Sequence, residues 1–243
     1  MSPSKRIIAV ANQKGGVGKT TTSINLATAL AACGRSVLLI DFDPQGNAST
    51  GLGIDDRAHN SYSLIAGGSG SDESIQKTQV PRLEIIPTVV DLSAAEVELS
   101  DMPDREFRLR GAISRISASY DYIIIDCPPS LGMLTVNALA AATSVLVPLQ
   151  CEFYALEGLS QLMRTIDAVK AGLNGALSMQ GIVLTMFDSR NKLSAMVAND
   201  VRDHFGELVY DTVVPRNVRV SEAPSFGQPV LIYDLKCPGS QAY

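Results

Sequence analysis

The residues best suited to chemistry stand in the run NQKGGVGKTTT (12–22). The second half of this run fits the phosphate-binding pattern G-x-x-x-x-G-K-[ST]. Counting back, the first glycine of the pattern is replaced by Gln13, and the next residue, Lys14, adds a second cation. The run therefore predicts a phosphate-binding loop, a P-loop, that has lost one glycine and gained one lysine.

The predicted loop follows an apolar strand and opens a helix, which is the context that a P-loop requires. Its glycines let backbone N–H groups approach phosphate oxygens, and the positive end of the next helix points at the same anion. We expect Lys19 to pair with the β- and γ-phosphates of ATP and the Thr20 hydroxyl to ligate Mg²⁺. The predicted nucleotide-contacting set in the loop is Lys14, Gly15, Gly16, Val17, Gly18, Lys19, Thr20 and Thr21.

Three aspartates stand at the ends of two other apolar runs, YIIIDCPPS and LLIDFDPQGN. Ligands of open parallel sheets bind beyond the carboxyl ends of the strands, so these carboxylates should converge on Lys19. Asp126 is of the type that holds the Mg²⁺ hydration shell in P-loop enzymes. Asp43 is expected to join the metal site and to orient the attacking water or accept its proton. Asp41 either supports the Mg²⁺ shell or caps the next segment.

The elements that must position these residues alternate between short β-branched runs and longer helical patterns. Continuous apolar strands suit a parallel sheet covered on both faces, and the intervening helices suit right-handed crossovers. A helix is predicted over 19–34, two helices broken near Met102 and Pro103 over 91–117, and a surface loop over 66–74. The predicted strands are 6–12, 36–43, 83–88, 120–128, 144–149, 180–187 and 208–215. The predicted fold is a single α/β domain over 1–243, with a doubly wound, mostly parallel sheet and helices on both faces.

The composition limits the class of protein. The chain has 243 residues, 46% of them hydrophobic, and a net charge of -5, which argues against both disorder and a generally basic DNA-coating protein. Four widely spaced cysteines without a C-x-x-C pair argue against a zinc site, and Cys33 and Cys127 are expected to be buried. With no apolar run of about 18 residues and no signal-peptide pattern, we expect a cytoplasmic protein that does not bind membrane.

Four segments together carry a resemblance: KGGVGKTTT, DFDPQGN, DYIIIDCPPS and PRNVRVSEAPSFG. From about residue 6 to its end, the sequence resembles the ParA/Soj chromosome- and plasmid-partitioning ATPases, which belong to the deviant Walker A class of P-loop ATPases. The first segment fits several relatives, whereas DPQGN and RNVRVSEAPS point to partition proteins of the chromosomal type. The resemblance implies an ATPase that uses ATP and Mg²⁺.

The resemblance also explains the extra lysine. In this class the lysine that corresponds to Lys14 reaches across a dimer interface to the nucleotide of the other subunit, as an arginine finger does. It implies an ATP-dependent homodimer in which Lys14, Lys19 and Asp43 serve hydrolysis. It further implies that the ATP-bound dimer binds double-stranded DNA without sequence preference on the nucleoid. Slow hydrolysis, stimulated by a ParB-type partner, would release that DNA.

The carboxyl-terminal third carries the remaining candidate residues. Met186, Phe187 and Pro215 are expected to surround the adenine and Asn217 to hydrogen-bond it, with core packing as the equal alternative for Met186 and Phe187. Candidate DNA-binding cations, of which Arg216 and Arg219 lie inside a family-like segment, are Arg190, Lys192, Arg202, Arg216, Arg219 and Lys236.

Three alternatives share the P-loop. A MinD-like cell-division ATPase would bind membrane through a C-terminal amphipathic helix, and the sequence ends at CPGSQAY without one. The terminal helix of the partition family is likewise expected to be absent. A nitrogenase-type iron protein would need a matching pair of cysteines, and a metabolic ligase or kinase would need a substrate motif. Neither a matching cysteine pair nor a substrate motif stands out in the sequence. The segments DPQGN and RNVRVSEAPS therefore favour the partitioning ATPase.

Overall fold

The computed structural model describes residues 6–67, 71–116 and 119–243. Within these residues the strands form one eight-stranded sheet in the order β3-β4-β2-β5-β1-β6-β7-β8. Every neighbouring pair is parallel except β3 with β4. The bounds are β1 (Arg6–Val10), β2 (Val37–Asp41), β3 (Gln76–Lys77), β4 (Leu83–Ile86), β5 (Tyr122–Asp126), β6 (Ser144–Gln150), β7 (Ser178–Phe187) and β8 (Val209–Pro215).

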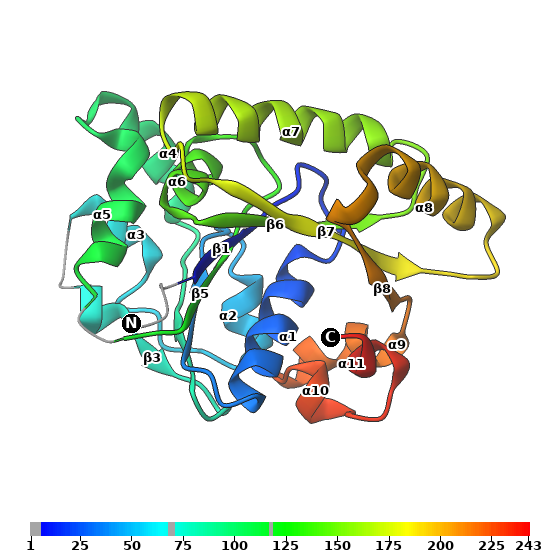
Figure 1. The fold of residues 1–243 in the computed structure, drawn as a ribbon. Coiled ribbons are helices and arrows are strands. Elements are labelled where there is room, and N and C mark those ends of the chain that lie inside the picture. Colours follow the sequence, from blue (N-terminus) through cyan, green and yellow to red (C-terminus); the bar gives the residue numbers. More distant parts are fainter. Residues whose placement is uncertain (1–5, 68–70, 117–118) are drawn as a thin grey trace.

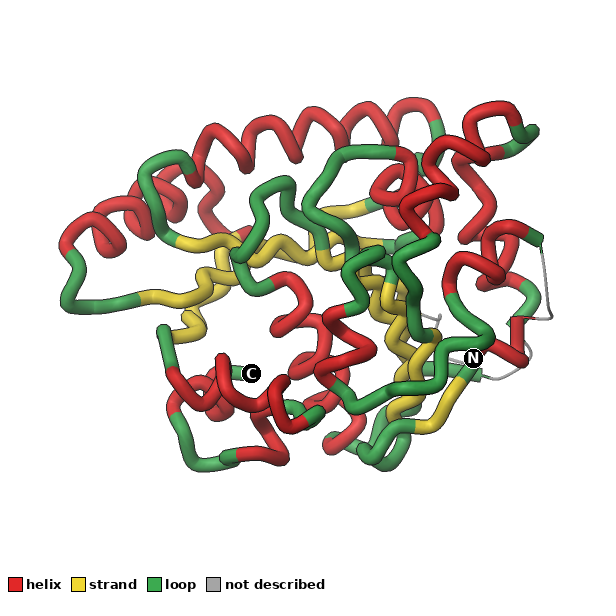
Figure 2. The backbone as a smooth tube through the Cα atoms, turned by 180° about the vertical axis from the view of Figure 1, so that it is seen from behind, coloured by secondary structure: helices red, strands yellow, loops and turns green. Residues whose placement is uncertain are grey.

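Helices cover both faces of this sheet (Figure 1). Figure 1 shows α7 and α8 above the strands, and α1 with α10 and α11 below them; Figure 2 shows the same layers from behind. The α-helices are α1 (Lys19–Ala32), α2 (Asn47–Gly51), α3 (Ser61–Ala66), α4 (Leu92–Glu98), α5 (Arg108–Ser114), α6 (Met133–Ala141), α7 (Ala155–Gly172), α8 (Lys192–Phe205), α9 (Val218–Glu222), α10 (Val230–Tyr233) and α11 (Pro238–Ala242). The 3-10 helices are η1 (Ser71–Ser74), η2 (Leu99–Asp101), η3 (Arg105–Phe107), η4 (Gly206–Leu208) and η5 (Ala223–Phe226).

The central strands are buried on both faces, which explains their unbroken apolar sequences. In β2, Leu38 and Ile40 enter the hydrophobic cluster that also contains residues of α6 and α7. Leu39, between them, enters the cluster that contains residues of α1. Successive side chains of a strand point to opposite faces, so a strand covered on both sides needs apolar residues at every position. The predicted doubly wound α/β fold is confirmed.

The predicted elements agree with the structure except at a few places. All seven predicted strands form, with ends that differ by up to two residues, and the predicted helix runs over Lys19–Ala32. The predicted break near Met102 falls between η2 and η3; residue 117 of that segment lies outside the described residues. The antiparallel strand β3 is not predicted because it has only two residues.

Two expectations are wrong. Residues 71–74 of the expected surface loop form η1, in which Ser71 and Ser74 are buried and the Ser71 hydroxyl donates to the carbonyl oxygen of Ala112 at 3.0 Å. Residues 68–70 of that loop lie outside the described residues. Cys33 is exposed because it follows the last turn of α1 as the helix cap, whereas Cys127 is buried as expected.

Replacing Leu39 with alanine should lower the free energy of unfolding by about 2–5 kcal/mol, because a fully buried side chain of a central strand leaves a cavity. Urea denaturation followed by circular dichroism measures this loss. The matched control is Leu235→Ala at a 63% exposed position, where the change should stay below about 0.5 kcal/mol. Equal losses in the two variants would contradict the described core.

Candidate nucleotide-binding site

The loop between β1 and α1 has the backbone of a phosphate cradle. Gly16 and Gly18 adopt φ angles of 74° and 85°, in the left-handed region where a side chain would be strained. Gly18 is also the N-cap residue of α1, and no side chain among the described residues caps that end. The first N–H groups of α1 are therefore free to bind an anion, which the helix dipole also favours.

Two polar side chains fix this loop to neighbouring strands. The Asn12 side-chain amide donates to the carbonyl oxygen of Pro148 in β6 at 2.7 Å, and its oxygen accepts from the backbone N–H of Lys14 at 3.0 Å. The Thr185 hydroxyl in β7 donates to the carbonyl oxygen of Val17 at 2.8 Å. Sequence reasoning missed Asn12 and Thr185, although both are polar residues near the carboxyl ends of otherwise apolar strands.

Lys19 lies inside the site. Only 6% of its surface is exposed, and its Nζ donates to the carbonyl oxygen of Lys14 at 3.0 Å, across the loop. Burial lowers the pKa of Lys19, and the nearby charges of Asp126 and Asp43 oppose that shift. The structure therefore brings this lysine to the carboxylates, as the sequence predicts.

Asp126 is completely buried at the end of β5. The Ser23 hydroxyl of α1 donates to its Oδ1 at 2.8 Å, while its Oδ2 has no hydrogen-bond partner among the described residues. Burial and the charge of Asp41 raise the pKa of Asp126 to about 8, and the hydroxyls of Thr20 and Ser23 oppose the shift. A buried carboxylate oxygen without a partner, beside a threonine hydroxyl, is a donor set that fits a hard cation such as Mg²⁺.

Asp41 pairs in register with Asp126 across β2 and β5, but it serves a different purpose. Its Oδ2 accepts from the backbone N–H and the hydroxyl of Ser49 at 2.7 and 2.6 Å. Ser49 belongs to α2, so Asp41 fastens that helix beneath the site. Of the two expectations for Asp41, the structure supports capping of the next segment.

Asp43 lies two residues beyond Asp41, at the rim of the site. It is 6% exposed, and its Oδ1 accepts from the backbone N–H of Gln45 at 3.1 Å. Burial raises the pKa of Asp43, and the Gln45 hydrogen bond and the charge of Lys19 oppose that shift. Asp43 is thus a carboxylate at the same site as Lys19 and Asp126, and the charge of each of these two groups acts on it or is acted on by it.

A cavity of about 550 Å³ is lined by Lys19, Thr20 and Asp43, whereas Asp41 and Asp126 are not among the described residues that line it. It is walled by the P-loop and α1, by Asp43 with the start of α2, and by the segment from α9 to α10. Its lining includes Gly15, Gly16, Gly18, Lys19, Thr20, Thr21, Asp43, Gln45, Pro129, Met186, Val220, Pro224 and Val230. Its size and its mixture of polar and apolar walls suit a nucleotide.

The expected adenine residues lie around an adjoining cavity of about 200 Å³. Met186, Pro215 and Asn217 all line it, and it shares Gly18 and Thr21 with the larger cavity. Phe187, by contrast, packs against the main hydrophobic core. The regular strand geometry is broken at this point, because Met186 adopts a φ of 48° and the register between β7 and β8 shifts between Leu184 and Phe187. The core-packing alternative therefore holds for Phe187.

Lys14 and Val17 differ from the other P-loop residues. Neither is among the described residues that line the two cavities. Val17 is buried beneath the loop. Lys14 is half-exposed and forms an ion pair with Glu152 at the start of the connection from β6 to α7. The two lysines of one loop therefore point in different directions, Lys19 into the cavity and Lys14 away from it.

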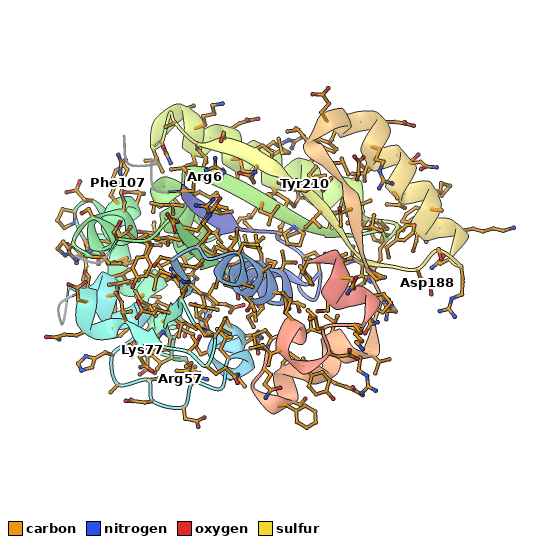
Figure 3. All side chains as sticks on the ribbon, turned by 60° about the horizontal axis from the view of Figure 1, so that its bottom comes forward. Arg6, Arg57, Lys77, Phe107, Asp188 and Tyr210 are labelled. Atoms are coloured by element: carbon orange, nitrogen blue, oxygen red, sulfur yellow. The ribbon has the colours of Figure 1, made fainter. Side chains whose placement is uncertain are left out.

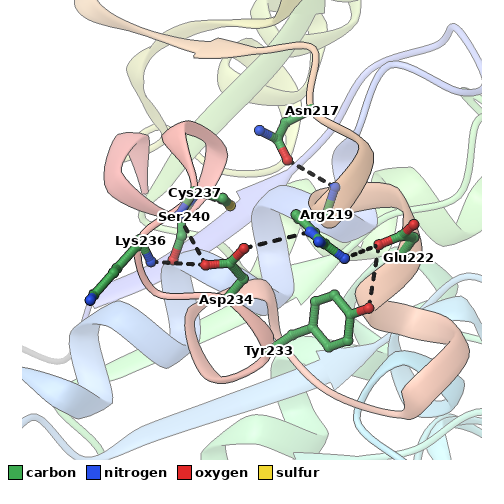
Figure 4. A network of polar contacts seen from close by, with 8 residues as sticks. All are labelled: Asn217, Arg219, Glu222, Tyr233, Asp234, Lys236, Cys237 and Ser240. Carbon is green, nitrogen blue, oxygen red and sulfur yellow. Dashed lines mark hydrogen bonds and ion pairs between the residues drawn. The ribbon is translucent and has the colours of Figure 1, made fainter.

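Of the candidate DNA-binding cations, Lys192 begins α8 and Arg202 lies in its last turn. The other four fall into two groups. Asp188, labelled in Figure 3, follows β7 and forms an ion pair with Arg190 at 2.9 Å. The charge of Arg216, which follows β8, lies close enough to lower the pKa of Asp188 further. Arg219 instead lies in a network with Glu222 at 3.0 Å and Asp234 at 3.6 Å, close to the backbone of Lys236 (Figure 4).

Comparison with known proteins gives one consistent family. The family model described as AAA domain matches residues 5–179. The chromosome partitioning protein ParA of Caulobacter vibrioides strain NA1000 is 62% identical over 242 residues, which is 98% of this chain and 91% of that protein. The sporulation initiation inhibitor protein Soj of Bacillus subtilis is 50% identical over 240 residues, 98% of this chain and 95% of that protein.

A solved structure shows the same fold. The chain described as cobyrinic acid a,c-diamide synthase from Mycobacterium smegmatis, with bound ADP and magnesium, is 39% identical. The two share 92% of each chain with a TM-score of 0.83. Within the described part of the present chain, no helix is both long enough and apolar enough to cross a lipid bilayer.

The buried Asp41 should make stability depend on pH. Its pKa is raised by burial from 3.8 to about 6, so the folded state holds this proton more tightly than the unfolded state. The stability contributed by the protonated form is present below about pH 4 and is lost as the pH rises through 6. Relative to Asp41→Asn, the wild type should lose on the order of 3 kcal/mol between pH 4 and 7. Urea denaturation across this range measures the difference, and a difference independent of pH would contradict the assignment.

Proposed function

This chain belongs to the ParA/Soj family of chromosome-partitioning ATPases, and we propose that it binds ATP with Mg²⁺ and pairs with a second copy through that nucleotide. The paired form then binds DNA without sequence preference and leaves it after hydrolysis, which a ParB-type centromere-binding partner accelerates. The observation that carries this proposal is the opposite orientation of Lys14 and Lys19. One lysine serves its own cavity, and the other is available to a neighbour.

Within one subunit, the residues of the cavity are suited to hold the triphosphate. The N–H groups after Gly16 and Gly18 would receive phosphate oxygens, and Lys19 would neutralise the β- and γ-phosphates. Thr20 and Asp126 would hold Mg²⁺, which supplies positive charge to the phosphate oxygens when bound. Met186 and Asn217 would border the base.

Hydrolysis would require a water held in line with the γ-phosphate. We assign this water to Asp43, whose carboxylate lies at the cavity rim beside Lys19. A carboxylate there can orient the water or accept its proton. Lys14 of the second subunit would add the cation that the transition state needs, so hydrolysis would occur only in the pair.

DNA binding would use the exposed cations at the carboxyl ends of β7 and β8. Arg190 and Arg216 are the better candidates. Arg190 pairs with one carboxylate, Asp188, and its side chain is 88% exposed, whereas Arg219 is 53% exposed and is held between Glu222 and Asp234. Pairing of two subunits would double the number of these cations, and the combined affinity would then exceed that of either subunit alone. The MinD-like alternative predicts vesicle binding instead, which a liposome flotation assay with ATP would reveal.

Substitutions of Lys14 and Lys19 should have different effects on ATP binding. Lys19→Gln should weaken ATP binding by about 10- to 100-fold, because a charged hydrogen bond contributes about 1.5–3 kcal/mol. Lys14→Gln should leave ATP binding by the monomer within about twofold, since its contact is made in the pair. Isothermal titration calorimetry measures both, and size-exclusion chromatography with ATP should show dimers only for the wild type. A severe loss of monomer binding in Lys14→Gln would place this lysine on its own subunit's nucleotide.

Charge reversal should identify the DNA-binding cations. Arg216→Glu and Arg190→Glu should each lower the slope of log affinity against log salt concentration by about 0.9 per lost phosphate contact. The matched control is Arg164→Glu, at an exposed position on α7 (Figure 1). Fluorescence anisotropy with labelled duplex DNA and ATP gives the slopes. Unchanged slopes for both variants, with normal dimerisation, would move the DNA-binding surface elsewhere.

A further inference from the structure

The ion pair of Lys14 joins two segments far apart in the sequence. Its partner, Glu152, comes 138 residues later, in the connection between β6 and α7. The Lys14 and Glu152 side chains are 42% and 43% exposed. Neither residue is among those described as lining the nucleotide cavity. The contact is therefore a separate feature of the surface beside the P-loop.

Both members of the pair stand on a fixed backbone. Lys14 is held through Asn12, which binds β6, as described above. The Glu152 N–H donates to the carbonyl oxygen of Gln150 at 2.9 Å, and the Glu152 carbonyl accepts from Ala155 N–H at 2.9 Å, at the start of α7. Because the same strand, β6, anchors both segments, the two side chains meet at a set position. Lys14 is thereby kept away from its own cavity.

The residues next to Glu152 indicate what this surface contacts. Phe153 and Tyr154 are 73% and 66% exposed, and their rings pack edge to face at 5.0 Å. Exposed aromatic side chains are enriched at protein–protein interfaces. They directly follow Glu152, whose partner Lys14 would reach a second subunit under the proposed function. A second copy of this chain is therefore the partner that this surface fits.

We propose that Glu152 is the positioning residue for Lys14, and this inference rests on the proposed function. In the single subunit its carboxylate holds the Lys14 ammonium off the subunit's own nucleotide. When a second copy docks, Lys14 exchanges this carboxylate for the phosphates of the partner's ATP. Half-exposed ion pairs are weak, so the exchange costs little, whereas a phosphate in a covered interface attracts the ammonium more strongly.

The first test measures how strongly the ion pair with Glu152 protects Lys14 in the nucleotide-free monomer. Lysine acylation followed by mass spectrometry should label Lys14 about two- to fivefold faster in Glu152→Gln than in the wild type, which is the range expected for releasing a weak ion pair. Glu152→Asp keeps the charge and should stay closer to the wild type. The matched control is Glu157→Gln, an exposed glutamate in the first turn of α7, which should not change the labelling. Equal labelling of Lys14 in the wild type and Glu152→Gln would overturn the proposal.

The second test measures whether releasing Lys14 from Glu152 promotes ATP-dependent dimerisation. With ATP, Glu152→Gln should dimerise at about fivefold lower protein concentration than the wild type in analytical ultracentrifugation, because two ion pairs no longer have to break in each dimer. The gain should vanish in a background that carries Lys14→Gln. Weaker dimerisation of Glu152→Gln, with Glu157→Gln normal, would overturn the proposal by placing Glu152 in the interface itself. Absence of ATP-dependent dimers in the wild type would instead refute the proposed function, and the labelling would still decide whether Glu152 holds Lys14.

Discussion

The structure depends on the burial of several charges at the carboxyl ends of neighbouring strands. Asp41 at the end of β2 and Asp126 at the end of β5 are adjacent in register, and Val10 at the end of β1 lies on the other side of Asp126. The Lys19 side chain of α1 approaches Asp126 and Asp43 closely enough for their charges to act on it. Buried carboxylates are costly unless they are hydrogen-bonded or paired with a cation. Ser49 and Ser23 satisfy one oxygen of each aspartate, and the remaining oxygens have no partner among the described residues. Burial, and after it the charge of Asp41, raises the pKa of Asp126, and a divalent cation at this carboxylate would relieve the cost of burying it.

The fold and the phosphate-binding loop could be predicted from the sequence, whereas the roles of several single residues could not. The strands and the P-loop were predictable because a fully covered parallel sheet requires continuous apolar runs, and a phosphate cradle requires glycines before Lys19. The role of Asp41 was not predictable, because its spacing from Asp43 fits both a metal site and a helix cap. Phe187 was similarly ambiguous, since the backbone irregularity at Met186, which no sequence pattern announces, changes the alternation of faces just before it. The pairing of Lys14 with Glu152 lay beyond sequence reasoning, because no local pattern links residues on separate elements.

The carboxyl-terminal segment connects the base side of the cavity with the candidate DNA-binding surface. Val220 lines both cavities, Arg219 precedes it on the same short helix, α9, and Arg216, a favoured DNA-binding candidate, lines the smaller cavity. The ion pairs of Arg219 with Glu222 and Asp234 tie this helix to the segment that follows α10 (Figure 4). A change in the walls around the nucleotide would therefore move charged groups at the surface. This proximity supplies a physical basis for coupling nucleotide state to DNA binding in the proposed function.

The central claim is that Lys14 acts on the nucleotide of the other subunit, and a mixing experiment tests it most directly. Lys14→Gln and Asp43→Ala should each be inactive alone. In a mixed dimer, one site would keep its own Asp43 and receive Lys14 from the other subunit. Mixing equal amounts before adding ATP should therefore restore ATPase activity, up to about a quarter of the wild-type rate, because each mixed dimer has one complete site and random association makes half of the dimers mixed. No restored activity, although mixed dimers form, would show that Lys14 acts within its own subunit and would contradict the account.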